Sequence, residues 1–96
     1  MLNLVYRKSL QEYKAMAAEA GIPDYMVDGI YNYVEHGIAP GDFLLAVLRN
    51  DLFGAVGSAD RVNAKRLKEW AIFLNWCVPS KCWGSTESIT NWIKSF

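Results

Sequence analysis

The two cysteines lie five positions apart, in "CVPSKC", and they are the first residues to consider for chemistry. A structural zinc site needs four ligands, usually from Cys and His, and the single histidine, His36, is distant in sequence. A nucleophilic cysteine needs a nearby base that favours the thiolate. Cys77 falls on the apolar face of an expected helix, where a free cysteine behaves as a small hydrophobic residue. We therefore expect Cys77 and Cys82 to be free thiols that bind no metal, with a disulfide across the short loop as the alternative.

The stretch "CWGSTES", residues 82–88, combines an aromatic side chain with a helix start. Ser85 and Thr86 are residue types that cap a first helical turn, and Glu87 suits the positive end of the helix dipole. Free N–H and hydroxyl groups at a helix start can also hold an anion, and Trp83 can stack on a base or fill the core. The stretch therefore predicts a capped helix start, which phosphate binding could also use.

The basic stretch "DRVNAKRLKEW" places Arg61, Lys65 and Lys68 on one face of an expected helix. A basic helix that follows a turn and another helix is also found in helix-turn-helix DNA-binding proteins. The net charge of the chain is zero, however, so there is no general attraction to nucleic acid phosphates. We expect a solvent-exposed face here and no binding to nucleic acid.

No pair of residues stands out for general acid–base catalysis. Asp24 and Asp28 are one helical turn apart, as many solvated carboxylates are. Asp51 lies at the edge of an apolar stripe, where a carboxylate should be paired, and we expect a structural link to Arg61 or to a Trp indole, with a ligand contact as the alternative. His36 precedes Gly37 at an expected helix C-terminus, which favours a structural role. We therefore expect a protein without catalytic activity and without a cofactor.

Hydrophobic spacing predicts an all-α fold, a compact bundle of about five short helices forming a single domain over residues 1–96. The expected helices cover about 3–20, 23–36, 40–55, 60–77 and the chain from 85 onward, with Gly21 and Gly37 as stops. The third helix is expected to bury a stripe that reaches Leu52 and Ala55. The chain is 52% hydrophobic, which leaves apolar surface for a partner or a second copy.

Charge is distributed unevenly along the chain. Residues 15–48 hold five carboxylates and no Lys or Arg, and the segments on both sides are basic. The acidic segment either packs against its own flanks or meets the basic surface of another copy, and we expect a symmetric homo-oligomer. No apolar run approaches the ~20 residues of a membrane span, and the N-terminus does not have the pattern of a signal peptide. We therefore expect no membrane partner and a cytoplasmic location.

The pattern "PGDFLLAVLRNDL", followed by "CWGSTE", resembles small accessory proteins of bacteriophages and prophages. The resemblance covers about residues 21–93. It is carried by Gly37, Pro40, Gly41, Phe43, Leu44, Ala46, Leu48, Asn50, Asp51, Leu52, Ala59, Asp60, Asn63, Cys82, Trp83, Gly84, Ser85 and Trp92. It implies a phage protein acting in the host bacterial cytoplasm and brings no activity with it. By analogy, such proteins oppose host defence, either by binding a host protein or by sequestering a nucleotide signal.

These observations lead to one main hypothesis and one alternative. The main hypothesis is a phage binding protein that sequesters a nucleotide-derived immune signal without changing it. The ligand-binding residues would be Trp83, Gly84, Ser85 and Thr86 at the helix start, with Arg61 and Lys65 supplying cations. The alternative is an inhibitor that binds a host protein. A sequestering protein needs a pocket with polar and aromatic groups, whereas an inhibitor needs an exposed apolar patch.

Overall fold

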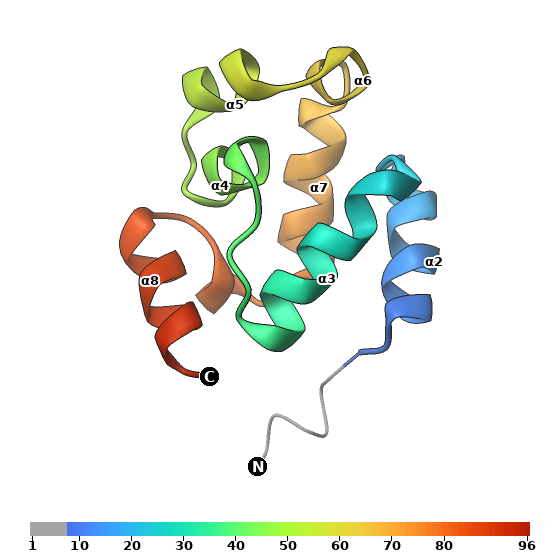
Figure 1. The fold of residues 1–96 in the computed structure, drawn as a ribbon. Helices are drawn as coiled ribbons and strands as arrows, with labels where there is room; N and C mark the ends of the chain where they lie inside the picture. Colours follow the sequence, from blue (N-terminus) through green and yellow to red (C-terminus); the bar gives the residue numbers. More distant parts are fainter. Residues whose placement is uncertain (1–7) are drawn as a thin grey trace.

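The computed structural model describes residues 8–96, and this part of the chain is all-α (Figure 1). It holds seven α-helices and two short 3₁₀ helices and no strand. In chain order they are α2 (Leu10–Ala20), η1 (Asp24–Met26), α3 (Val27–His36), α4 (Asp42–Leu48), α5 (Leu52–Ser58), α6 (Arg61–Ala64), α7 (Leu67–Cys77), η2 (Ser80–Cys82) and α8 (Thr86–Lys94). The expected fold class is confirmed, and the helix count is seven rather than five.

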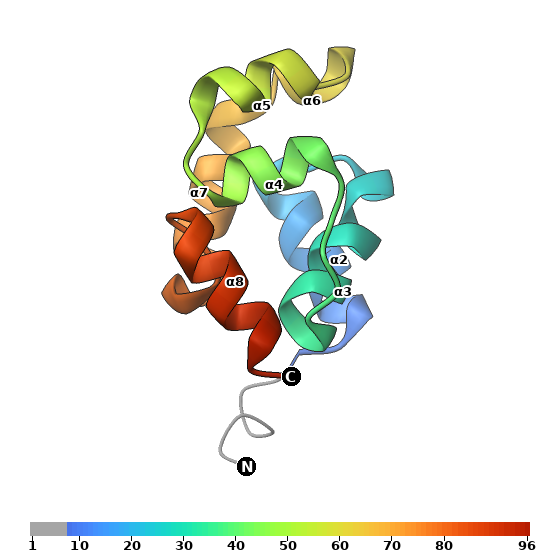
Figure 2. The same ribbon diagram turned by 60° about the vertical axis from the view of Figure 1, so that its left-hand side comes forward.

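The helices surround one core. Helix α2 packs against α3 and α7, α5 packs against α4, and α8 packs against η2. In both views α5 and α6 lie together at one end of the molecule, where α7 begins, and α8 lies nearer the opposite end (Figures 1 and 2). No helix within residues 8–96 combines the length and the apolar character that crossing a bilayer would require.

Helix α2 begins at Leu10 rather than near residue 3, and its first turn explains why. The Ser9 hydroxyl accepts a hydrogen bond from the Glu12 amide at 3.2 Å, and the Glu12 carboxylate accepts one from the Ser9 amide at 2.8 Å. This reciprocal capping box marks a helix N-terminus. Residues 3–7 of the expected helix lie outside the described part of the chain, which begins at residue 8. Gly21 and Gly37 end α2 and α3 in left-handed conformations, as expected.

The expected helix over 40–55 is divided in two at Asn50, which has a φ of 66°. Asparagine is one of the few residue types besides glycine that adopts this left-handed conformation readily. The turn ends α4 at Leu48, and Asp51 then caps α5 with its side chain. Because α5 starts in a new direction, Ala55 is buried while Leu52 is 62% exposed. The expectation that Leu52 belongs to the buried stripe was therefore wrong.

The expected helix over 60–77 is also divided. Asp60 caps α6. Before α7 begins, the amides of Lys65 and Arg66 donate to the carbonyl oxygens three residues earlier, those of Val62 and Asn63, as in a 3₁₀ turn. Asn63 is 2% exposed, and its side-chain oxygen accepts a hydrogen bond of 2.9 Å from the indole of Trp70. A buried polar partner thus anchors the largest core side chain at the break between the two helices.

The core is built around aromatic side chains. Trp70 is fully buried and makes edge-on contacts with Phe43 and Phe73. The Tyr33 hydroxyl donates a hydrogen bond of 2.6 Å to the carbonyl oxygen of Cys82, which links α3 to the segment before α8. Every buried side-chain polar atom within residues 8–96 has a hydrogen-bond partner.

Candidate functional site

Most polar groups of the predicted anion-binding corner, at the start of α8, form hydrogen bonds within the chain. The Ser85 hydroxyl accepts a hydrogen bond from the Ser88 amide at 3.1 Å and caps α8, as expected. The Gly84 amide donates to the Leu48 carbonyl at 2.6 Å. The Trp83 indole donates to the Val78 carbonyl at 3.3 Å, and its half-buried ring packs on the core. Of the four predicted residues here, only Thr86 is exposed without such a bond to the chain.

Arg61 and Lys65 are not brought to this corner. Both are exposed, at or just beyond α6, which precedes the N-terminus of α7. Trp83 follows the C-terminal end of α7, and the eleven residues of that helix span about 16 Å. Figures 1 and 2 show α6 and the start of α8 well apart. The structure therefore separates the two halves of the predicted nucleotide site.

A shallow groove of 270 Å³ lies elsewhere, between η1, α3 and the start of α4. It is lined mainly by apolar groups, together with the carboxylate of Asp42 and the phenol of Tyr25. The Tyr25 hydroxyl donates to the Asp60 carboxylate at 2.5 Å, which ties this edge to α6. The groove is slightly smaller than typical ligand pockets, and it contains none of the six predicted ligand-binding residues.

The two cysteines are free thiols, and burial makes both poor nucleophiles. Burial raises the pKa of the Cys82 thiol to about 12, with a smaller contribution from the Glu35 carboxylate. Burial also raises the pKa of Cys77, which is only half-buried. Neither residue is thus held as the reactive thiolate. Residues 8–96 contain no group of three or more His, Cys, Asp or Glu side chains placed to share a metal ion.

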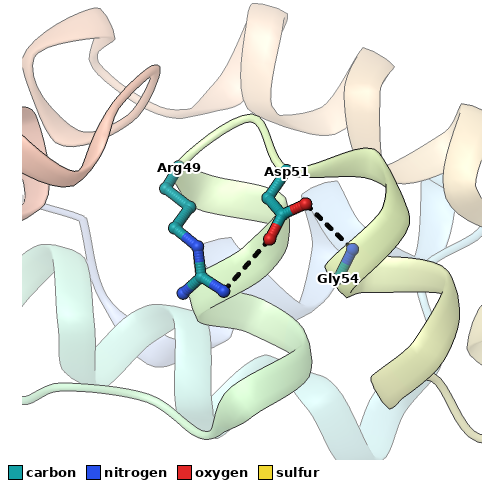
Figure 3. A network of polar contacts seen from close by, with 3 residues as sticks. All are labelled: Arg49, Asp51 and Gly54. Carbon is teal, nitrogen blue, oxygen red and sulfur yellow. Dashed lines mark hydrogen bonds and ion pairs between the residues drawn. The ribbon is translucent and has the colours of Figure 1, made fainter.

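Asp51 has a structural role, but with different partners from those expected (Figure 3). Its carboxylate accepts a hydrogen bond from the Gly54 amide at 2.9 Å and forms an ion pair with Arg49 at 3.2 Å. The hydrogen bond from the Gly54 amide is the main cause that lowers the pKa of the Asp51 carboxyl, and the contact with Arg49 is the second. The expected contact with Arg61 or an indole is not present; the indole of Trp70 bonds to Asn63 instead. Asp51 is a helix cap that also orients an arginine.

One buried polar network was not predicted. Glu35, on α3, is only 7% exposed and accepts a hydrogen bond of 2.8 Å from the Tyr13 hydroxyl of α2. Burial, together with the Glu35 carboxylate, raises the pKa of Tyr13 well above its usual value. The signal in the sequence was that Glu35 directly follows Tyr33 and Val34, which face the core. The network joins α2 to α3, and all its described contacts are internal.

The surface is most unusual where apolar side chains face solvent. On α5, Leu52, Phe53 and Val56 are 62%, 87% and 52% exposed, and we call these three residues the α5 face. On α7, Ile72 and Trp76 lie one turn apart and are 44% and 79% exposed, and we call this pair the α7 face. Large exposed apolar groups that cluster on one surface mark sites of protein contact.

The two faces lie on different parts of the molecule. Helix α5 is at the end where α7 begins (Figures 1 and 2), and Trp76 is in the last turn of α7. The α7 face could have been found from the sequence, since Ile72 and Trp76 fall on the side of the helix opposite the core residues Trp70, Phe73 and Leu74.

A comparison of the chain with protein-family models, curated proteins and solved structures finds no match.

Proposed function

We propose that the protein is a non-catalytic binding module that contacts a partner protein through the α7 face. The observation that carries the proposal is the exposure of Trp76, at 79%, one helical turn from the exposed Ile72. Tryptophan is strongly enriched among the residues that dominate binding energy at interfaces. An exposed Trp–Ile pair on a regular helix is a rigid surface, so little side-chain or backbone ordering opposes binding.

Partner-protein binding is favoured over nucleotide sequestration because the polar groups predicted to hold a nucleotide are either bonded within the chain or far from one another. The hydroxyl of Ser85 and the amide of Gly84 are bonded within the chain, and the cations of Arg61 and Lys65 lie near the other end of α7. A partner protein does not need these groups. In the phage setting that the sequence resemblance implies, the partner is a host defence or regulatory protein in the bacterial cytoplasm.

Site-specific photocrosslinking tests the proposal. A photoreactive amino acid in place of Trp76 is expected to capture one defined protein from bacterial lysate, identified by mass spectrometry. The same group in place of Thr90, an exposed residue on α8, is the matched control and should capture none. Binding of the identified protein should then weaken at least tenfold in Trp76→Ala.

Two results would overturn this function. One is equal capture of the same proteins from residues 76 and 90, which would mean that the α7 face is not selective. The other is calorimetric binding of a cyclic dinucleotide, a cyclic trinucleotide or an ADP-ribose derivative that is lost in Trp83→Ala. That outcome would favour nucleotide sequestration over the binding of a partner protein.

A further inference from the structure

The charged side chains around the α7 face are mostly basic. The segment over residues 61–81, which holds α6, α7 and η2, contains five cations and one carboxylate, a net charge of +4. All five cations are exposed, and none forms an ion pair or a side-chain hydrogen bond within residues 8–96. They are Arg61, Lys65, Arg66, Lys68 and Lys81. These charges are therefore available to a partner.

Two of these cations continue the line of the apolar pair. Lys68, Ile72 and Trp76 follow one another at intervals of four residues, so their side chains lie along one side of α7. The distance along the helix from Lys68 to Trp76 is about 12 Å. Lys65 lies where α6 ends, just before α7, and adds charge beyond Lys68. This side of the molecule therefore changes from cationic at the start of α7 to apolar at its end.

The one carboxylate of the segment, Glu69, is turned toward the end of α2. It is half-buried, and a Cβ atom built on Gly21 would lie 3.2 Å from the Glu69 Cγ. The same Cβ would lie 3.9 Å from a guanidinium nitrogen of Arg66, so Glu69 has a cation beside it. Glu69 and Arg66 offset each other at this edge, and Lys65 and Lys68 have no such neighbour within the segment.

Helix α2, which packs along α7, brings charges of both signs to the other end of the α7 face. Burial is the main cause that raises the pKa of Cys77, while Lys8 lowers it and Glu19 raises it. The two charged residues therefore act on the end of α7 in opposite directions. The excess of positive charge is at Lys65 and Lys68.

We infer that the partner protein binds the α7 face through an acidic segment. The segment sets apolar side chains against Ile72 and Trp76, and carboxylates against Lys65 and Lys68. This inference rests on the proposed function and names the chemistry of its partner. Apolar anchors supply most of the affinity, and opposite charges across the interface speed association and disfavour basic partners. A nucleic acid fits less well, because Ile72 offers a base no stacking surface and the chain has no net charge.

Selection from a random library of displayed peptides, each longer than α7, tests the inference with the full chain as bait. Peptides that also bind Trp76→Ala are discarded, so that only peptides dependent on the α7 face remain. We expect these peptides to combine apolar residues with an excess of Asp and Glu over the starting library. The peptide that binds best is then synthesised for affinity measurements.

Charge reversal separates complementarity from general stickiness. The affinity of the synthetic peptide should fall about tenfold or more in Lys65→Glu/Lys68→Glu. This variant should fold normally, because both positions are exposed and a carboxylate is favourable at the start of a helix. Lys94→Glu, which removes an exposed cation of α8, is the matched control and should leave the affinity unchanged.

Three results would overturn the inference. The first is a set of Trp76-dependent peptides with no excess of Asp and Glu, and the second is the absence of any such peptide. The third is binding of a single-stranded oligonucleotide that is lost in Lys65→Glu/Lys68→Glu, without selection of acidic peptides, which would assign the cations to nucleic acid. The proposed function is read separately, from photocrosslinking at residue 76, so the two failures can be told apart.

Discussion

The amide of Gly84 donates a hydrogen bond of 2.6 Å to the carbonyl oxygen of Leu48, which joins the segment before α8 to the last turn of α4. The bond satisfies one of the carbonyl groups left free where α4 ends. Gly84 can make it because its φ is 119°, a conformation that L-residues with side chains rarely adopt. This corner is a structural joint between two helices.

Gly84→Ala should destabilise the protein by about 1–3 kcal/mol through backbone strain. No atom lies within 4 Å of a Cβ built at Gly84, so steric crowding adds nothing. The matched control is Gly57→Ala, which also meets open space but lies in a regular helix. It should stabilise by about 0.5–1 kcal/mol. Urea unfolding of dilute samples measures both, and equal shifts in one direction would contradict the strain argument.

Asn63→Ala should cost about 1–3 kcal/mol, because the indole N–H of Trp70 would be left buried without an acceptor. Asn63 and Trp70 are 2% and 0% exposed, so water cannot easily replace the lost bond. Asn75→Ala, at an exposed position on α7, is the control and should change stability by less than about 0.5 kcal/mol. In a Trp70→Phe background the cost of Asn63→Ala should shrink, and an unchanged cost would refute the coupling.

Acid should destabilise the fold through the helix caps Asp51 and Asp60. The pKa of Asp51 is lowered by the Gly54 amide and Arg49, and that of Asp60 by the Tyr25 hydroxyl and the Asn63 amide. A lowered folded-state pKa contributes stability that is present above the unfolded pKa and lost as pH falls through the folded pKa. The urea midpoint should therefore decrease below about pH 4.

Asp51→Asn tests the assignment of this acid sensitivity. Asparagine still caps a helix but cannot be protonated in this range, so the variant should show a weaker decrease between about pH 4 and pH 2. Its midpoint near neutral pH should lie between those of the wild type and Asp51→Ala. An identical pH profile in wild type and Asp51→Asn would remove Asp51 from the explanation.

Alkylation should distinguish the two thiols in the folded protein. At pH 8 the Cys82 thiol is fully buried and its pKa is about 12, so it should stay unmodified. Cys77 is half-buried and should react first. In urea both should react at similar rates, because burial is the cause of the difference. Mass spectrometry of a time course gives the two rates, and equal rates in the native state would contradict the described burial.

Local signals in the sequence predicted the ends of several helices correctly. Gly21 and Gly37 stop α2 and α3, and Ser85 caps α8. Each of these signals acts through the few residues beside it, by backbone conformation or a single hydrogen bond. Such features are readable without knowing the rest of the fold.

The divided helices could not be read in the same way. Leu48 and Leu52, on either side of the Arg49–Asp51 segment, have a spacing that suits one continuous helix, but the left-handed turn at Asn50 instead lets α5 pack against α4. Glu35 is buried because Tyr13, 22 positions earlier, supplies a hydrogen bond. Arg61 and Trp83 are far apart because one precedes α7 and the other follows it, so the length of this helix lies between them. These outcomes depend on contacts between distant segments, which spacing along one helix does not describe.

The turn at Asn50 has a consequence for how this chain can change over generations. Helix α5 contributes one small side chain, Ala55, to the core. The exposed positions Leu52, Phe53, Val56 and Gly57 can therefore be altered with little loss of folding stability, whereas a side chain at Gly54 would collide with the capping carboxylate of Asp51. Selection can remodel this segment to follow a changing binding surface, while Trp70 and its neighbours continue to hold the rest of the molecule together.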